Sequence, residues 1–126
     1  MHDITSRTDL FLLMQKFYAK LLSDNRIQYI FTDIAQIDLE AHLPHLTDFW
    51  EQTILHQGSY RKNVMQLHLD LNAKEKLTPE HFTVWLEHFN KTVDENFKGD
   101  RSELIKTRAL SIATVMQLKI SQKSHN

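Results

Sequence analysis

The chain contains no cysteine, and only two glycines and two prolines occur among its 126 residues. The lack of cysteine excludes disulfide bonds, thiolate-ligated haem, iron–sulfur clusters and cysteine nucleophiles, and it fits a reducing compartment. Because glycine and proline form most tight turns, their scarcity favours long helices over a sheet. We therefore expect an all-α protein, and the length fits a single domain over residues 1–126.

The chain also lacks a surplus of basic residues and a long apolar run. Fifteen Lys and Arg face sixteen Asp and Glu, which gives a net charge of -1. Such a balance offers little to neutralise phosphates, so nucleic acid and anionic membranes are not expected partners. No apolar run approaches the length of a bilayer span, and the start MHDITSRTDL does not resemble a secretion signal. The cytoplasm is the expected location.

Apolar residues recur at helical spacing in four long stretches. Asp38 and Thr78 are predicted helix N-caps, Gly58 a left-handed C-terminal cap, and Asp100 with Glu103 a capping-box-like start. The sequence thus predicts four long helices and two short ones, at residues 8–24, 38–56, 78–98 and 100–121, and at 25–31 and 63–72.

One short apolar segment, NVMQLHLDLN at 63–72, contains a single histidine, His68. A histidine in such a segment, between strong amphipathic helices, is what a buried axial ligand to a metal or haem iron requires. On this segment alone, a partly buried structural histidine is the commoner explanation.

Further polar side chains fall on the predicted inner faces. His42 lies on the inner edge of the second long helix, whereas His45 points away from it, and Tyr18 lies at the edge of the first helix's apolar face. A capping or solvated histidine and an ordinary half-buried tyrosine fit these positions as well. The loop residues Tyr60 and Arg61 could meet carboxylates of a cofactor or could simply be solvated.

The predicted core is rich in aromatic residues, namely Phe17, Tyr18, Phe31, Phe49, Trp50, Phe82, Trp85 and Phe89. Burying Tyr18, His42 and His68 among them without partners would cost about 1 to 3 kcal/mol each. A large flat cofactor that carries a metal would resolve this conflict.

Four blocks, in this order and spacing, resemble the truncated, two-over-two haemoglobins, and group III in particular. They are FYAKLLSDNRIQYIFTD at 17–33, HLPHLTDFWE at 42–51, GSYRKN with MQLHLDL at 58–71, and LTPEHFTVWLEHF at 77–89. The resemblance implies a globin-like two-over-two helical sandwich that binds haem b (iron protoporphyrin IX). It implies His68 as the iron ligand, Tyr18, His42 and Trp85 on the distal, gas-binding side, and haem contacts from the residues Phe31, Leu46, Phe49, Tyr60, Arg61 and Trp85. Lys62 departs from the small residue that the family more often has there, which leaves the contacts of this loop open.

Distal hydrogen-bond donors would stabilise a bound diatomic gas, such as dioxygen, nitric oxide or carbon monoxide, and slow its release. Slow release fits oxidation of nitric oxide, peroxide handling or gas sensing better than bulk oxygen transport, so an enzymatic role and a reductase partner stay open. No helix is apolar all round, which favours a monomer.

Three alternatives remain. One is a haem-free, globin-like module for protein interaction, although the presence of His68 does not favour it. A second is a non-haem metal site built from His42 with His45 or His81 with His88, which lack nearby inward carboxylates. A hydrolase is the third, but no serine lies on a sharp Gly-flanked turn.

Overall fold

A computed structural model describes residues 1–34, 38–56 and 77–124 of the chain. Most of these residues are helical, and no strand occurs within the described ranges. In order, the elements are α1 (Arg7–Leu22), the π-helical turn η1 (Ile30–Ile34), α2 (Leu39–Trp50), the π-helical turn η2 (Glu51–Leu55), α4 (Pro79–Asn96) and α5 (Asp100–Ser124). The all-α prediction and its four long helices are confirmed, whereas the short helix predicted at 63–72 lies outside the described residues.

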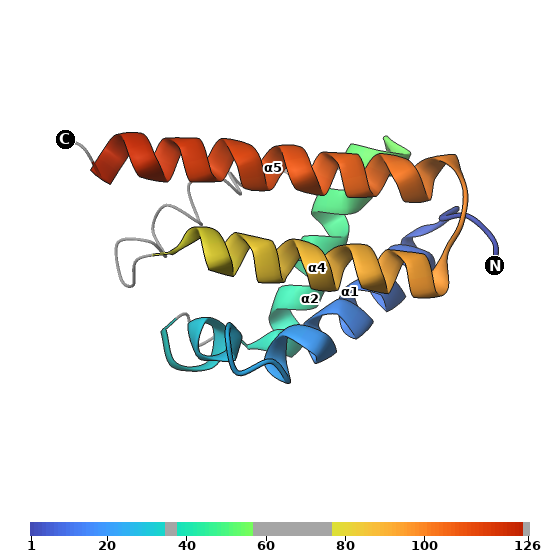
Figure 1. Ribbon diagram of the computed structural model, residues 1–126. Helices are drawn as coiled ribbons and strands as arrows, with labels where there is room; N and C mark the ends of the chain where they lie inside the picture. The colour runs from blue at the N-terminus through green and yellow to red at the C-terminus, as the bar shows by residue number, and fades with distance from the viewer. Residues whose placement is uncertain (35–37, 57–76, 125–126) are drawn as a thin grey trace.

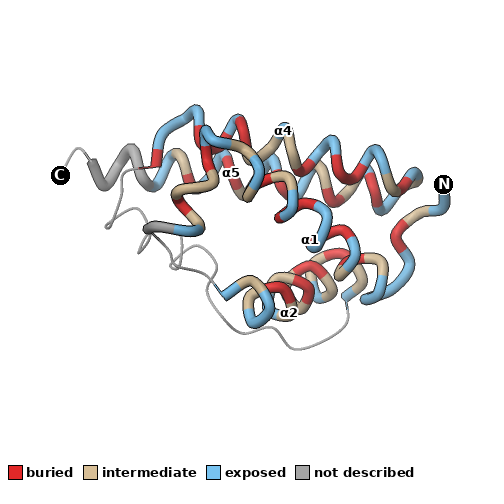
Figure 2. Tube along the Cα trace, turned by 90° about the horizontal axis from the view of Figure 1, so that it is seen from below, coloured by how far each residue is buried: buried red, intermediate tan, exposed pale blue. Residues whose placement is uncertain are grey.

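The helices form two packed pairs, α1 with α2 and α4 with α5, which meet through a contact between α1 and α4. Figure 1 shows α4 and α5 lying side by side, with α2 crossing behind them at a steep angle. Figure 2 shows that the buried residues of α1, α2 and α4 form a stripe on each helix. Each helix is therefore amphipathic, as its apolar spacing predicts. The arrangement confirms the two-over-two helical sandwich.

The turn between α1 and η1 explains why the predicted short helix at 25–31 is displaced. Asp24 accepts a hydrogen bond from the backbone N–H of Arg26 at 2.9 Å, and its carboxylate also binds the Arg26 side chain. A side chain that satisfies the backbone two residues later favours a turn over a helix. Helical hydrogen bonding consequently resumes later, and the π-helical turn begins at Ile30.

The second helix begins at its predicted cap, with the Asp38 side chain accepting from the N–H of Ala41, and continues into η2. It ends at His56, which has a left-handed backbone with φ of 57°. The sequence predicts the left-handed cap at Gly58, whereas the structure has it two residues earlier, at His56. Gly58 lies outside the described residues.

Thr78 caps α4 as predicted, and its partner is a histidine. The Thr78 hydroxyl accepts from the N–H of His81, and the His81 ring accepts from the N–H of Thr78. Pro79 occupies the first turn, where its missing N–H costs nothing. This reciprocal pair forms a capping box in which His81 takes the place that Glu or Gln usually has.

The predicted capping box at Asp100 and Glu103 is wrong, because Asp100 is already inside the helix. Asp3, far away in sequence, caps α5 instead: its carboxylate accepts from the backbone N–H groups of Arg101 and Ser102, both at 2.9 Å. Gly99 permits this approach. Its φ is +147°, and an added Cβ would lie only 2.5 Å from Cγ of Asp3.

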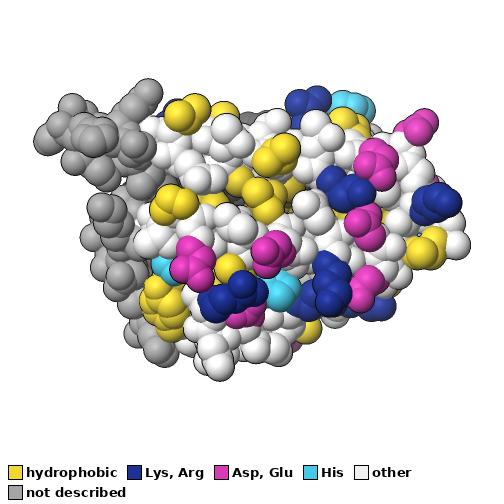
Figure 3. All heavy atoms as spheres, in the orientation of Figure 1, with side chains coloured by type: hydrophobic (Ala, Val, Ile, Leu, Met, Phe, Trp, Pro, Cys, Tyr) yellow, Lys and Arg dark blue, Asp and Glu magenta, His cyan; other side chains and the backbone are white. Residues whose placement is uncertain are grey.

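Charged side chains of both signs are interspersed over the face that α4 and α5 present in Figure 3, with exposed hydrophobic side chains between them. Lys106 pairs with Asp94, and Lys20 pairs with Glu95. Exposed pairs of this kind contribute little to stability. Within the described part of the chain, no helix is both long and apolar enough to cross a membrane.

We expect Asp3→Ala to lower the free energy of unfolding by about 1 kcal/mol, because it removes the cap of α5. Burial raises the pKa of this carboxyl, but hydrogen bonds from Ser102, Arg101 and Ile4 outweigh burial and leave the pKa below its ordinary value. The carboxylate therefore stabilises the fold above the pKa of the unfolded chain, about 4, and this contribution is lost as the pH falls through the lower folded pKa.

Denaturant unfolding of wild type, Asp3→Ala and the matched control Asp100→Ala, from about pH 3 to about pH 7, measures this effect, because the contribution is complete above about pH 4 and decreases below it. The control should change stability by no more than a few tenths of a kcal/mol. A larger loss in Asp100→Ala than in Asp3→Ala would contradict the assigned cap.

Candidate functional site

Tyr18 is the most deeply buried polar side chain among the predicted site residues that the structure describes, with 5% of its surface exposed. It lies on the inner face of α1, next to Phe17, within the apolar stripe that packs on α2 and α4. Burial raises the pKa of its phenol well above the ordinary value. The hydroxyl is therefore a neutral donor and acceptor across the physiological pH range.

His42 supplies the hydrogen-bond partner of this phenol. Its Nε2 lies 3.2 Å from the Tyr18 hydroxyl, and the two rings meet edge to face. When Nε2 carries the proton, His42 donates to the phenol oxygen and the Tyr18 O–H is free to donate elsewhere. When Nε2 is unprotonated, the phenol donates to it. The tautomer of His42 thus decides which way the Tyr18 proton points.

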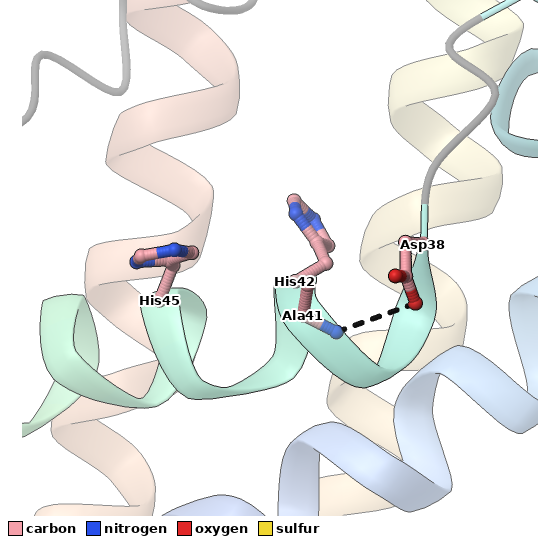
Figure 4. A pocket seen from close by; sticks show the side chains of 4 residues that line it. All are labelled: Asp38, Ala41, His42 and His45. Carbon is pink, nitrogen blue, oxygen red and sulfur yellow. Dashed lines mark hydrogen bonds between the residues drawn. The ribbon is translucent and has the colours of Figure 1, made fainter.

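His42 is also partly exposed and borders a hollow of about 200 Å³ that Asp38, Ala41 and His45 complete. Figure 4 shows the His42 and His45 rings leaving the same helix without pointing toward each other. His45 is exposed, as the sequence predicts. The hollow is smaller than ordinary ligand pockets of about 300 to 1,000 Å³. It therefore suits access to His42 rather than a cofactor.

Aromatic rings surround the polar pair on its inner side. Phe31, in η1, meets the Tyr18 ring edge to face with centroids 5.5 Å apart. Phe17 meets Tyr18 in the same way and also meets Trp85 of α4 at 5.6 Å. Trp85 in turn stacks on Phe89. The structure thus brings Tyr18, His42 and Phe31 into direct contact, and Trp85 joins them through Phe17.

Leu46 and Phe49, the other predicted contact residues of α2, are partly buried and pack against the same core. Phe49 also meets Trp50 with centroids 4.9 Å apart. Partial exposure on an otherwise apolar face is what side chains at the edge of a pocket show. The remaining predicted residues, His68, Tyr60 and Arg61, together with Lys62, lie outside the described residues.

The non-haem metal alternative finds no support in the described part of the chain, where no group of three or more His, Cys, Asp or Glu side chains could hold a metal ion. His81 and His88, which sequence spacing pairs on one helix, bind different partners: Tyr29 and Asp24. Sequence reasoning missed this role of His81, because its partner is 52 residues away.

Two comparisons with known proteins bear on this site. The chain is 30% identical over 108 residues to "Group 3 truncated hemoglobin ctb" of Campylobacter jejuni subsp. jejuni, and the alignment covers 83% of each protein. The chain belongs to the group III truncated haemoglobins. A crystal structure of group III truncated hemoglobin from Campylobacter jejuni also matches, with a TM-score of 0.83, 25% identity and coverage of 95% of both chains. No protein-family model matches.

Membership of the truncated haemoglobins confirms the family that the four sequence blocks resemble. It also makes the donor set around Tyr18 interpretable. A buried phenol, an imidazole within hydrogen-bond reach and an indole, set among apolar rings, are the neutral donors and apolar walls that suit the gas-binding side of a haem. The described residues therefore fit one half of a haem pocket.

The buried Tyr18 phenol should remain un-ionised in the folded protein well past the ordinary tyrosine range, because burial raises its pKa. Near-ultraviolet absorbance of tyrosinate, titrated in parallel for wild type and Tyr18→Phe, measures this. The two folded proteins should gain equal absorbance, and the additional tyrosinate should appear only when wild type unfolds. If wild type gained the absorbance of one more tyrosinate than Tyr18→Phe near the ordinary tyrosine pKa of about 10, Tyr18 would be accessible to solvent.

Proposed function

We propose that this truncated haemoglobin binds haem b, with His68 as the iron ligand and with Tyr18, His42 and Trp85 on the opposite, gas-binding side. Family membership supports the haem, and the donor set around Tyr18 supports the gas-binding side. His68 would be held by a hydrogen bond from its second ring nitrogen to the Val64 carbonyl, one helical turn earlier. Phe31, Leu46 and Phe49 would pack on the porphyrin, and Tyr60 and Arg61 would meet its carboxylates.

The Tyr18–His42 hydrogen bond is the observation that carries the proposal. A phenol in an apolar interior costs free energy unless its hydroxyl is paired, and α2 provides the partner. An ordinary core tyrosine also needs a polar partner, but that partner need not reach solvent. His42 does reach solvent. The pair therefore suits a pocket that binds a small polar ligand and is accessible from solvent.

A bound haem would supply an iron that can take up dioxygen, nitric oxide or carbon monoxide. The chain's own residues then determine how long the gas stays. With Nε2 of His42 protonated, the Tyr18 O–H donates into the pocket, and the Trp85 indole N–H can only donate. Phe31 and Leu46 keep water out, which strengthens both hydrogen bonds.

Strong donors slow the release of dioxygen, so we propose ligand chemistry rather than bulk oxygen delivery. Oxidation of nitric oxide to nitrate and reduction of peroxide to water both fit a pocket that retains its ligand. Both need an electron donor to return the iron to its starting state, and a reductase is one class of partner that could supply the electrons. A monomer is proposed because no helix of the described residues is apolar all round.

In the haem-reconstituted ferrous protein, Tyr18→Phe should raise the dissociation rate constant of dioxygen by about 10- to 100-fold, the range that a hydrogen bond to a charged acceptor supplies. Stopped-flow displacement of dioxygen by carbon monoxide measures it. His45→Ala is the control, because it changes an exposed side chain that borders the outer hollow. It should leave the rate constant within about twofold of the wild-type value, as surface substitutions usually do. An unchanged rate in Tyr18→Phe would refute the donor role of Tyr18.

A further inference from the structure

A second polar pair in the fold, Tyr29 with His81, has no part in the gas-binding site described above. The Tyr29 hydroxyl lies 2.8 Å from Nε2 of His81, which is only 9% exposed in the first turn of α4. The bond joins segments 52 positions apart in sequence. It therefore fixes the start of α4 against the segment that leads into η1.

The tautomer of His81 follows from its other contact. The backbone N–H of Thr78 can only donate, and it donates to Nδ1 of His81 at 3.1 Å. Nδ1 must therefore be unprotonated, and the single proton of the neutral ring lies on Nε2. Consequently His81 donates to the Tyr29 oxygen, and one imidazole both caps α4 and binds Tyr29.

Each partner stands close to an aromatic wall of the gas-binding site. Phe31 follows Tyr29 by two residues and meets the Tyr18 ring. Trp85 lies one helical turn after His81, on the same side of α4, and meets Phe17. The Tyr29–His81 bond thus connects the η1 segment, which bears Phe31, with the helix that bears Trp85.

We propose that Tyr29 and His81 are positioning residues, whose hydrogen bond sets the placement of Phe31 against Tyr18 and of Trp85 against Phe17, and thereby the rate at which gas leaves the pocket. The proposal rests on the function proposed above. Neither side chain touches the gas. Their effect is carried by Phe31 and Trp85, and small displacements of a donor are sufficient to change a rate.

Two substitutions of His81 separate its contacts. The Asn oxygen of His81→Asn takes the position of Nδ1, so it keeps the bond from Thr78 and loses Tyr29. The longer Gln side chain of His81→Gln places its NH₂ near Nε2, so it keeps the bond to Tyr29. Its oxygen can take the role that Gln usually has at this capping-box position. Tyr29→Phe removes the same bond as His81→Asn from the other side. Tyr29→Phe and His81→Asn each lose one hydrogen bond, and comparable decreases in the thermal unfolding midpoint are expected for these two variants.

The first measurement is the dissociation rate of dioxygen from the haem-reconstituted ferrous proteins. Tyr29→Phe and His81→Asn should change the rate by about 2- to 10-fold, whereas His81→Gln should stay within about 2-fold. The second is the NMR resonance of the Trp85 indole N–H in the haem-free protein, assigned with Trp85→Phe. It should shift in the first two variants and keep its wild-type position in His81→Gln.

His88→Asn is the matched control, because it removes the 2.7 Å contact between His88 of α4 and Asp24 in the turn before η1. It should lower stability without changing the rate or the resonance. Wild-type rates in Tyr29→Phe and His81→Asn would overturn the proposal. Changes in His81→Gln and His88→Asn as large as those in Tyr29→Phe would also overturn it, and would indicate general loosening. If wild type binds no haem, the proposed function fails, and the Trp85 resonance alone then decides whether the pair positions that wall.

Discussion

A phenol hydroxyl inside an apolar core must find a polar partner, and the placement of Tyr18 makes this requirement a constraint on the whole fold. Its partner, His42, comes from a different helix, so α1 and α2 must cross in a register that brings the Tyr18 hydroxyl within 3.2 Å of Nε2 of His42. Phe17 and Phe31 then enclose the phenol with ring edges. The same contacts that stabilise the helix pair therefore exclude water from the Tyr18 hydroxyl. This coupling of packing with donor strength is what a gas-binding pocket requires.

Helix ends carry the other long-range constraints. Asp3 caps α5, and the chain folds back over Gly99 because only a residue without Cβ leaves room for its carboxylate. His81 caps α4 and also binds Tyr29, which ties the η1 segment to that helix. The first backbone N–H groups of a helix have no partner within the helix. At α5 they bind a side chain from a remote segment, and at α4 the capping side chain also contacts a remote segment. The two helix pairs are thereby fixed relative to each other by polar contacts as well as by the core.

Sequence reasoning predicted features that depend on neighbouring residues and missed those that depend on distant ones. Apolar periodicity found the four long helices, and local cap signals placed the starts at Asp38 and Thr78. The same local logic failed at Asp100, because the true cap is contributed by Asp3. His42 was found because its position on a helix face is a local property. The pairing of His81 with Tyr29 was missed because no spacing rule links them. The site roles of Tyr18, His42 and Trp85 stay predictions. So do those of His68, Tyr60 and Arg61, which lie outside the described residues.

The central claim, that a histidine-ligated haem faces the Tyr18–His42 pair, is tested most directly by the ultraviolet–visible spectrum of the haem-reconstituted protein and of its His68→Ala variant, in the ferric, ferrous and carbon monoxide-bound states. The account predicts an intense Soret band in wild type and altered ferrous and carbon monoxide-bound spectra in the variant, because the variant lacks the imidazole ligand. Wild type that takes up no haem specifically, or identical spectra from the two proteins, would contradict the claim and favour a haem-free helical interaction module.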